Sequence, residues 1–183
     1  MRNILLLFVC ILFAGEVCSQ VTFTKVTTGA IVNDASYTEG VYWFDYNNDG
    51  LLDMFAANIT NQNNILFRND GSGNFTKITA GALVNDGGFS YGASIGDYNN
   101  DGFPDIFVVN GGSSASQNNF FYSNNGDGTF TKVTTGTFVN EIGNSWGSSS
   151  VDYDKDGKLD IYTANYNRNN FLYKGNGDGS FTK

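Results

Sequence analysis

A repeated acidic nonapeptide is the feature that most constrains the fold of this chain. It begins at residues 45, 97 and 152, at steps of 52 and 55, and reads Asp-Tyr-Asn-Asn-Asp-Gly-Leu-Leu-Asp in the first copy. The tripeptide Phe-Thr-Lys keeps nearly the same step, beginning at Phe23, Phe75, Phe130 and Phe181. Because such periods indicate repeated structural units, we expect three units near 29–80, 81–135 and 136–183.

Each unit is predicted to contain four short strands. In the first unit, runs rich in Val, Phe, Leu and Ile occupy 41–45, 52–58, 64–68 and 75–79, separated by clusters of Asn, Asp and Gly, which is the pattern of strands and hairpins. No sustained helical period follows residue 19. An all-β fold of three four-stranded β-propeller blades is therefore expected, with a stacked β-solenoid as the alternative.

The first 19 residues differ from the rest of the chain. Arg2 precedes an apolar run from residue 4 to 14, and small residues follow at 17 and 19, so residues 1–19 are predicted to be a secretory signal peptide rather than a membrane anchor. Cleavage there leaves 20–183 as a secreted, extracellular or cell-surface chain without a membrane span. It also removes both cysteines, Cys10 and Cys18, and the chain contains no His. Disulfides, thiol and imidazole catalysis and His/Cys metal sites are thereby excluded from the mature chain.

The charge balance points to cations as partners. Ten Lys and Arg residues stand against 18 Asp and Glu residues, for a formal net charge of −8. Such a chain lacks the basic surface that nucleic acids and anionic membranes require, so neither partner is expected.

The spacing of each nonapeptide is suited to calcium. Oxygen-bearing side chains fall at positions 1, 3, 5 and 9, the carbonyl of position 7 can add a further ligand, and Gly at position 6 permits the sharp turn. Ca²⁺ takes six to eight oxygen ligands, whereas Mg²⁺ demands a small octahedral site. An EF-hand is excluded, because the required Glu at position 12 is replaced by Ala56, Val108 and Thr163. Ordinary Asx-rich turns are the remaining alternative.

These residues resemble the FG-GAP/VCBS-type repeats of calcium-binding β-propellers, including those of integrin α-chains. The resemblance rests on Tyr91-Gly-Ala-Ser-Ile-Gly-Asp97 and the nonapeptide that follows it, on their copies after Gly40 and Gly147, and on the segment from Asn64 to Lys77. It implies one blade per repeat and about three structural Ca²⁺ ions. The ligands it implies are Asp45, Asn47, Asp49, Leu51 and Asp53; Asp97, Asn99, Asp101, Phe103 and Asp105; and Asp152, Asp154, Asp156, Lys158 and Asp160, where Leu51, Phe103 and Lys158 contribute carbonyl oxygens.

The number of units bears on completeness. Closed propellers contain about 4–8 blades, whereas this sequence holds three units and one extra outer strand expected at 21–28. We therefore expect a piece of a longer protein, with that strand completing a last blade. Three blades alone leave an exposed edge that favours association.

Function is predicted to be non-enzymatic binding of an extracellular protein or glycan, as in cell adhesion, with no catalytic residues. The alternative is a non-catalytic part of a secreted polysaccharide-acting enzyme, and a purely structural surface repeat is a third reading. Outside the loops the main acidic residues are Asp34, Glu39, Asp86 and Glu141, of which three recur at matching positions and are assigned a structural role. The aromatic residues Tyr42, Trp43, Phe44, Tyr91 and Trp146 are expected to fill space between blades rather than to form a carbohydrate platform.

Overall fold

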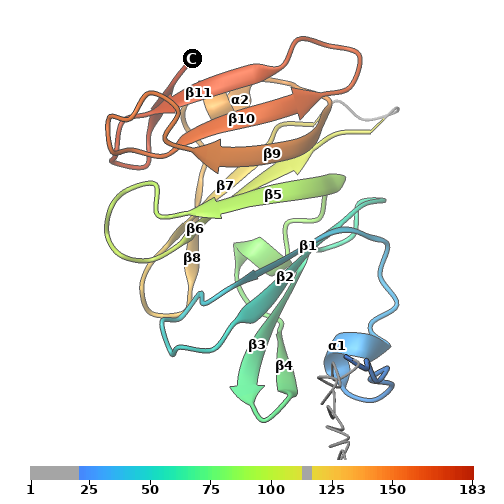
Figure 1. Cartoon of the computed structure of the whole chain (residues 1–183). Helices are drawn as coiled ribbons and strands as arrows, with labels where there is room; N and C mark the ends of the chain where they lie inside the picture. Colours follow the sequence, from blue (N-terminus) through green and yellow to red (C-terminus); the bar gives the residue numbers. More distant parts are fainter. Residues whose placement is uncertain (1–20, 113–116) are drawn as a thin grey trace, which may run out of the picture.

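The computed structural model describes residues 21–112 and 117–183. Within them the chain forms three four-stranded antiparallel sheets, each built from four strands consecutive in sequence. The sheets follow one another from the first unit to the third, and their first strands, β1, β5 and β9, lie side by side (Figure 1). The expected all-β fold of incomplete propeller blades is confirmed, and each sheet is called a blade below.

The strands agree with the sequence pattern to within a few residues. In the first blade, the predicted strands at 41–45 and 52–58 correspond to β1 and β2, and the Gly-rich turn joins β3 to β4. The first blade comprises β1 (Thr38–Phe44), β2 (Asp53–Asn58), β3 (Ile65–Gly71) and β4 (Asn74–Ile78); the second β5 (Ser90–Gly96), β6 (Asp105–Asn110), β7 (Phe120–Asn124) and β8 (Phe130–Val133); and the third β9 (Ser145–Val151), β10 (Asp160–Asn165), β11 (Phe171–Gly175) and β12 (Phe181–Thr182).

Apolar side chains fill the two spaces between successive blades. The first space contains Phe55 and Leu66 of the first blade packed with Ile106 and Val108 of the second. The second space contains Phe107 and Phe121 of the second blade packed with Ile161 and Tyr173 of the third. Because successive side chains along a strand point to opposite faces of the sheet, the middle blade contributes to both cores. The blades therefore hold one another through burial of apolar surface.

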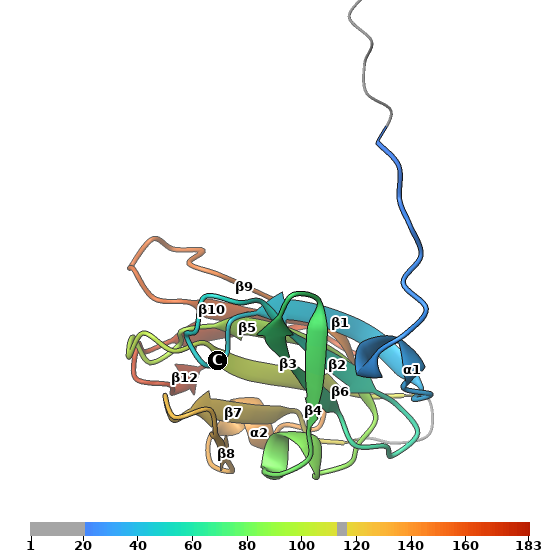
Figure 2. The same ribbon diagram turned by 90° about the horizontal axis from the view of Figure 1, so that it is seen from below.

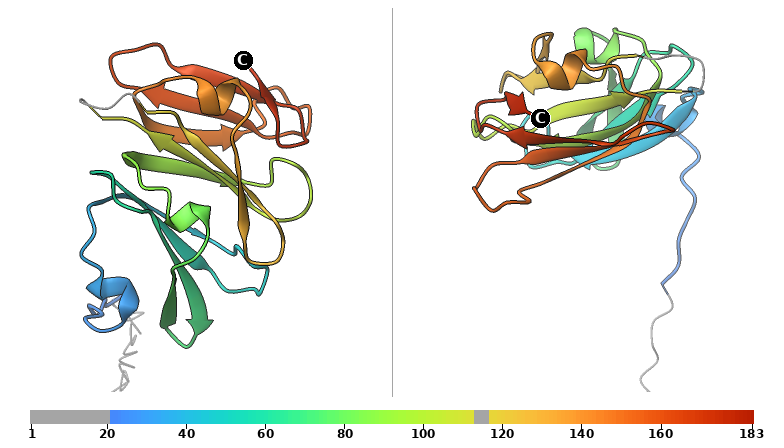
Figure 3. Two further views of the ribbon diagram at one scale, coloured as in Figure 1. Left: turned by 180° about the vertical axis from the view of Figure 1, so that it is seen from behind. Right: turned by 90° about the horizontal axis from the view of Figure 1, so that it is seen from above.

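Three short helical turns precede the blades, which the sequence analysis did not predict. They are α1 (Ala30–Asn33), η1 (Ala82–Val84) and α2 (Thr137–Asn140), visible at the sides of the sheets in Figures 2 and 3. Each follows a glycine with φ between 97° and 105°, at Gly29, Gly81 and Gly136. Such a backbone angle suits glycine. Three or four residues are too few for a recognisable helical period, so the sequence pattern does not predict these turns.

Two expectations for the N-terminal region have different outcomes. Residues 21–28 form no strand and are exposed along their length, so the expected extra outer strand is wrong for this chain. The physical reason is that a single strand needs a neighbour to satisfy its backbone groups, and the described residues provide none there.

The predicted signal peptide, 1–19, lies outside the described residues. Within the described ranges, no helix is long and apolar enough to cross a membrane.

Candidate functional site

The three acidic loops lie at the same edge of the molecule, each between the first two strands of its blade (Figure 1). In every copy the backbone N–H of position 5 donates to the carboxylate of position 1, at 3.0–3.1 Å. The N–H of Gly at position 6 donates to the other oxygen of that carboxylate, at 2.7–2.9 Å. The N–H of position 7 donates to the carboxylate of position 5, at 2.8–3.0 Å. The same set of bonds therefore shapes all three loops.

This arrangement depends on the glycine at position 6. Gly50, Gly102 and Gly157 have φ of 84°, 90° and 83°, in the region that disfavours residues with a Cβ. The turn brings the side-chain oxygen of position 3 to the same N–H of position 5, at 3.0–3.3 Å. The side-chain oxygens of positions 1 and 3 thus converge on the backbone N–H of position 5 in each loop.

Position 9 plays a different part in the loop. Asp53, Asp105 and Asp160 are fully buried. One carboxylate oxygen accepts the N–H of position 2, at 3.1 Å in each copy. The other accepts an N–H from the third strand of the blade, at 2.7–2.8 Å. The residue therefore fastens the loop to its sheet, while each oxygen keeps a second lone pair for another partner.

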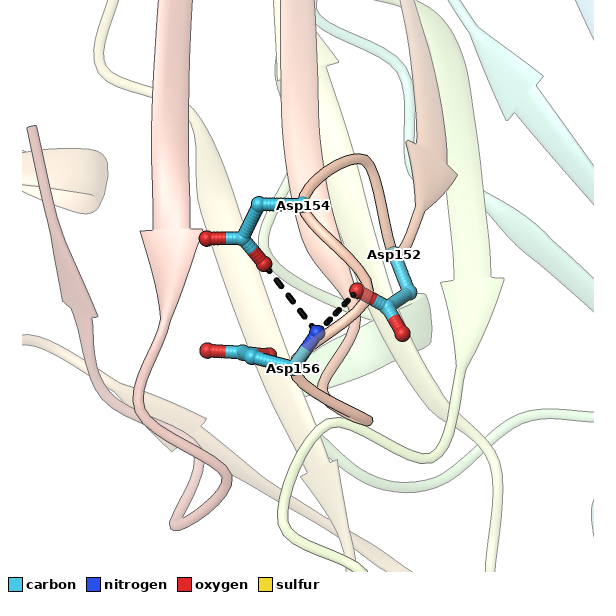
Figure 4. Close-up of side chains that lie close together, drawn as sticks. All are labelled: Asp152, Asp154 and Asp156. Atoms are coloured by element: carbon cyan, nitrogen blue, oxygen red, sulfur yellow. Dashed lines mark hydrogen bonds between the residues drawn. The ribbon is translucent and has the colours of Figure 1, made fainter.

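The third loop is the most acidic. Carboxylate oxygens of Asp152, Asp154 and Asp156 lie within 4.8 Å of one another, and Figure 4 shows the backbone N–H of Asp156 bonded to the other two side chains. Asp160 stands outside this three-carboxylate group. Lys174 on β11 donates to Asp154 and lies 3.2 Å from Asp156. Sequence reasoning missed Lys174, because its counterparts in the other blades are Arg68 and Ser123 and the position carries no repeated pattern.

The donor set fits a hard cation. The side chains at positions 1, 3 and 5 are carboxylates or Asn amides, whose oxygens are the ligands that Ca²⁺ prefers. Position 9 has unused lone pairs, so it remains compatible with the predicted ligand role. The backbone carbonyls of Leu51, Phe103 and Lys158 remain predicted ligands.

Burial changes the titration of the position 9 carboxyl groups. Removal from water raises the pKa of Asp105 to about 6, although N–H bonds from Asn124 and Tyr98 oppose the shift. Burial also raises the pKa of Asp53. In the third loop, burial acts to raise the pKa of Asp156, but bonds from Lys174 and the N–H of Lys158 bring it below its usual value.

A stack of three aromatic rings lies where β5 and β9 begin and β10 ends. The ring of Trp146 stacks on that of Tyr91 and on that of Tyr166, with centroids 5.0 Å apart in both pairs and interplanar angles of 14° and 21°. Trp146 and Tyr166 are exposed. The indole N–H of Trp146 donates to Asn144 Oδ1 at 3.3 Å.

The five aromatic residues singled out in the sequence have different environments. Phe44 is buried in the core and Tyr42 packs against it, as expected. Trp43 is exposed and makes an edge contact with Phe75. For Trp146 the expectation of space filling between blades is incomplete, since about half of its surface faces solvent.

The acidic residues that recur before the first strand of each blade are engaged in ion pairs. Lys77 lies 2.5 Å from Asp34, Lys132 lies 2.7 Å from Asp86, and Lys183 pairs with Glu141. These lysines belong to the Phe-Thr-Lys repeats. These ion pairs agree with the structural role predicted for the three acids.

A family model decides the classification of these repeats. The model described as FG-GAP-like repeat matches residues 45–108 and 97–163, which together cover well over half of the chain. The chain belongs to the FG-GAP-like repeat family. Each match begins at the first Asp of an acidic loop and continues into the following blade. No curated protein matches the chain by sequence.

Solved structures share the fold of these FG-GAP-like repeats. A lectin from Agrocybe aegerita, whose structure is described as the basis of specific recognition of non-reducing terminal N-acetylglucosamine, superposes with a TM-score of 0.52. The two sequences are 21% identical, and the match covers 78% of this chain and 37% of the lectin. The chain therefore spans well under half the length of that lectin, and the likeness shows the fold alone.

Proposed function

We propose that this chain is a secreted, non-enzymatic FG-GAP-like module that binds extracellular glycans, with about three structural Ca²⁺ ions in its acidic loops. The observation that carries the calcium assignment is the threefold recurrence of one hydrogen-bonded loop in which side-chain oxygens of positions 1 and 3 meet at the N–H of position 5, with the three carboxylates of the third loop within 4.8 Å of one another. Turns that served only to reverse the chain would not need these oxygens at all three positions in all three copies. The charge agrees, since three Ca²⁺ ions offset most of the formal charge of −8.

Calcium in such loops stabilises the blades rather than performing chemistry. Close carboxylates repel one another without a counter-ion, so a bound cation relieves that repulsion and ties positions 1, 3 and 5 together. We expect affinities on the order of 10⁻⁴–10⁻³ M, as in other extracellular calcium modules.

The calcium assignment is tested by titrating residues 20–183 in a calorimeter while circular dichroism is recorded. Saturation near three ions per chain, with β-structure stabilised by Ca²⁺ and weakened by chelator, is the expected result. The matched control is Mg²⁺ at the same concentration, which should bind more weakly because it keeps its own waters. If the chain is folded and binds no Ca²⁺, the calcium assignment is wrong and the loops are ordinary Asx-rich turns.

The aromatic stack supports a glycan as the partner. Exposed aromatic rings bind the apolar faces of sugar rings, and neighbouring amides such as Asn144 offer hydrogen bonds to hydroxyl groups. The stack joins two blades, because Tyr91 belongs to β5 of the second blade, whereas Trp146 and Tyr166 belong to the third. The fold shared with a sugar-binding lectin is consistent with this assignment.

Intrinsic fluorescence provides a direct test, because the chain contains only two tryptophans, Trp43 and Trp146. In a Trp43→Phe variant, emission reports on Trp146 alone. We expect glycans identified on an array to change this emission in a saturable manner, and Trp146→Ala to abolish their binding while calcium binding is retained. An array without ligands in saturating Ca²⁺ would contradict the glycan assignment and leave the calcium proposal intact.

A further inference from the structure

Each blade has a β-bulge near the start of its first strand. The pairing of the first strand with the second skips one residue in every copy, which is Glu39 in β1, Tyr91 in β5 and Trp146 in β9. Bulges re-aim a side chain and are frequent beside functional sites. Because each first strand runs from its bulge to its acidic loop, the three bulges lie at the end of the blades away from the acidic loops.

Two of the three bulged side chains are aromatic rings that stack on each other. The centroids of Tyr91 and Trp146 are 5.0 Å apart, and Tyr166 stacks on Trp146 at the same distance. Within the described part of the chain the two tyrosine rings do not contact each other, so they take opposite faces of the indole. A sugar ring therefore cannot lie flat on Trp146, and the outer faces of the stack belong to the two tyrosines.

The third bulged residue, Glu39, belongs beside Tyr91. Strand β5 lies between β1 and β9 (Figure 1), so the face of Tyr91 away from Trp146 is turned to the first blade. The neighbouring Gly92 has the same surroundings, since a Cβ there would lie 3.0 Å from the hydroxyl oxygen of Tyr42 on β1 and 3.5 Å from the carbonyl oxygen of Trp146 on β9. By the repeat, Glu39 stands to Tyr91 as Tyr91 stands to Trp146.

Glu39 differs from every other acidic residue in 21–112 and 117–183. The carboxylates of the others all accept hydrogen bonds from backbone N–H groups or side chains. Glu39 is exposed and makes no hydrogen bond or ion pair with the described residues. Its two oxygens therefore keep their full acceptor capacity for a ligand.

An aromatic face beside an unpaired carboxylate suits a neutral sugar. A pyranose ring with equatorial substituents presents C–H groups on its faces, which pack on an aromatic ring. Its hydroxyl groups donate to a carboxylate, and the charge of the acceptor strengthens these hydrogen bonds. A uronic acid of the same ring shape packs equally well, but it brings a second carboxylate close to Glu39, and like charges repel.

We propose that the glycan stacks on the face of Tyr91 turned to the first blade, and that Glu39 accepts its hydroxyl groups and selects neutral sugars over uronic acids. This inference rests on the proposed glycan-binding function and adds the class of sugar. Because Glu39 is exposed, the preference should be about fivefold in affinity at low ionic strength, the scale of an exposed charge pair. It should shrink at high salt, since screening weakens the repulsion.

The emission of Trp146 in a Trp43→Phe chain tests the preference in saturating Ca²⁺. The probes are cellotetraose, N-acetylated chitotetraose and the tetramer of β-1,4-linked glucuronic acid. We expect both neutral tetrasaccharides to bind and the glucuronate to bind about fivefold more weakly. Glu39→Gln removes the charge and keeps an acceptor, so the glucuronate should then bind within about twofold of cellotetraose. Asp127→Asn removes an equal charge from the exposed turn between β7 and β8 and should leave the preference unchanged.

Two variants of Tyr91 locate the sugar. Tyr91→Ala should lose cellotetraose binding and Tyr91→Phe should keep it, with circular dichroism and calcium stoichiometry unchanged in both, because the bulge lies away from the acidic loops. Equal affinity for glucuronate and cellotetraose in the Trp43→Phe chain, or an unchanged preference in Glu39→Gln, would overturn the role of Glu39 and leave the glycan assignment intact. If neither neutral tetrasaccharide binds, this inference is wrong, and the glycan array decides independently whether another glycan does.

Discussion

The second and third acidic loops share one backbone frame and manage their charge in different ways. In the second loop, the amide of Asn99 donates to Asp101 at 2.8 Å. In the third loop, Asp154 stands at that position, and the ammonium group of Lys174 bonds to it and lies close to Asp156. The third loop thus has one more carboxylate than the second, and the ammonium group of Lys174 lies against it.

The comparison shows that the repeat preserves the hydrogen-bonded backbone of the loop. The residues that offset the negative charge of its carboxylates differ from one copy to the next. The glycine turn and the bonds to positions 1, 5 and 9 are the same in every copy. A cation entering the second loop meets carboxylates and an amide, whereas one entering the third must displace an ammonium group. We therefore expect the two loops to bind Ca²⁺ with distinguishable affinities.

The largest expected effect comes from removing position 1. Asp97→Ala deletes a carboxylate that orders two backbone N–H groups of the second loop, and the equivalent change in the third loop is Asp152→Ala. Each variant should lose one calcium site while the other two remain, so the stoichiometry in calorimetry should fall from about three to about two. An unchanged stoichiometry in either variant would exclude that loop as a site.

The next effect concerns pH in the presence of chelator. Burial gives Asp105 a folded pKa of about 6, above the ordinary value of 3.8, so the folded chain holds that proton more tightly than the unfolded chain between these values. The free energy of unfolding should therefore fall as the pH rises from about 4 to 6, by at most about 3 kcal/mol. Urea titrations at successive pH values measure this slope, and Asp105→Asn should flatten it.

A matched control for the pH experiment lies in the hairpin of the third blade. Hydrogen bonds from Ser180 hold the pKa of Asp178 below its usual value. Because the pKa of Asp178 is lower in the folded chain than its ordinary value of 3.8, its contribution to stability is fully present above that value. The contribution is lost only as the pH falls through the lowered pKa. Asp178→Asn should consequently leave the slope between pH 4 and 6 unchanged, and an equal flattening in both variants would contradict the assignment to Asp105.

A smaller effect is expected from Lys174→Ser, which gives the third blade the residue found at Ser123. Loss of the ammonium group removes a competitor for Asp154 and Asp156, so calcium affinity at the third loop should rise by about threefold, the scale of a surface ion pair. The calorimetric titration is easier to interpret when Lys174→Ser is made in an Asp97→Ala background, because the second loop then contributes no calcium binding. A lower affinity would mean that Lys174 orders the loop for the metal rather than competing with it.

The smallest effect is predicted for Lys158→Ala. Its Nζ lies 3.8 Å from Asp156, and such exposed pairs contribute little. Calcium affinity at the third loop should change by less than about twofold, and the change should vanish at high salt because screening weakens surface charges.

The repeat made most of the fold predictable from sequence. Strands bounded by Asn, Asp and Gly clusters were located within a few residues, because alternation and turn chemistry act locally. Residues 21–28 were misassigned, because whether an apolar run becomes a strand depends on a neighbour that sequence does not show. The helical turns after Gly29, Gly81 and Gly136 were missed, although the repeated string that begins at each glycine is itself a signal.

The candidate site was predictable to a similar extent. The approach of the position 1 and position 3 side chains to the N–H of position 5 follows from the spacing and the glycine turn. The burial of position 9 and its bonds to the third strand depend on pairing between strands, which the nonapeptide alone does not reveal. Lys174 and the stack of Trp146 with Tyr91 and Tyr166 are tertiary contacts between segments distant in sequence. They carry no local pattern and were found only in the structure.

The ion pairs of the Phe-Thr-Lys lysines have a consequence for how such chains grow. Lys77 reaches back to Asp34, Lys132 to Asp86 and Lys183 to Glu141, so every pair joins the end of a unit to its own beginning. A gene duplication that copies one unit therefore copies both partners of the pair. Insertion or deletion of a whole unit therefore leaves no lysine or carboxylate of these pairs without its partner. As far as these pairs are concerned, the number of blades can change without a compensating mutation elsewhere.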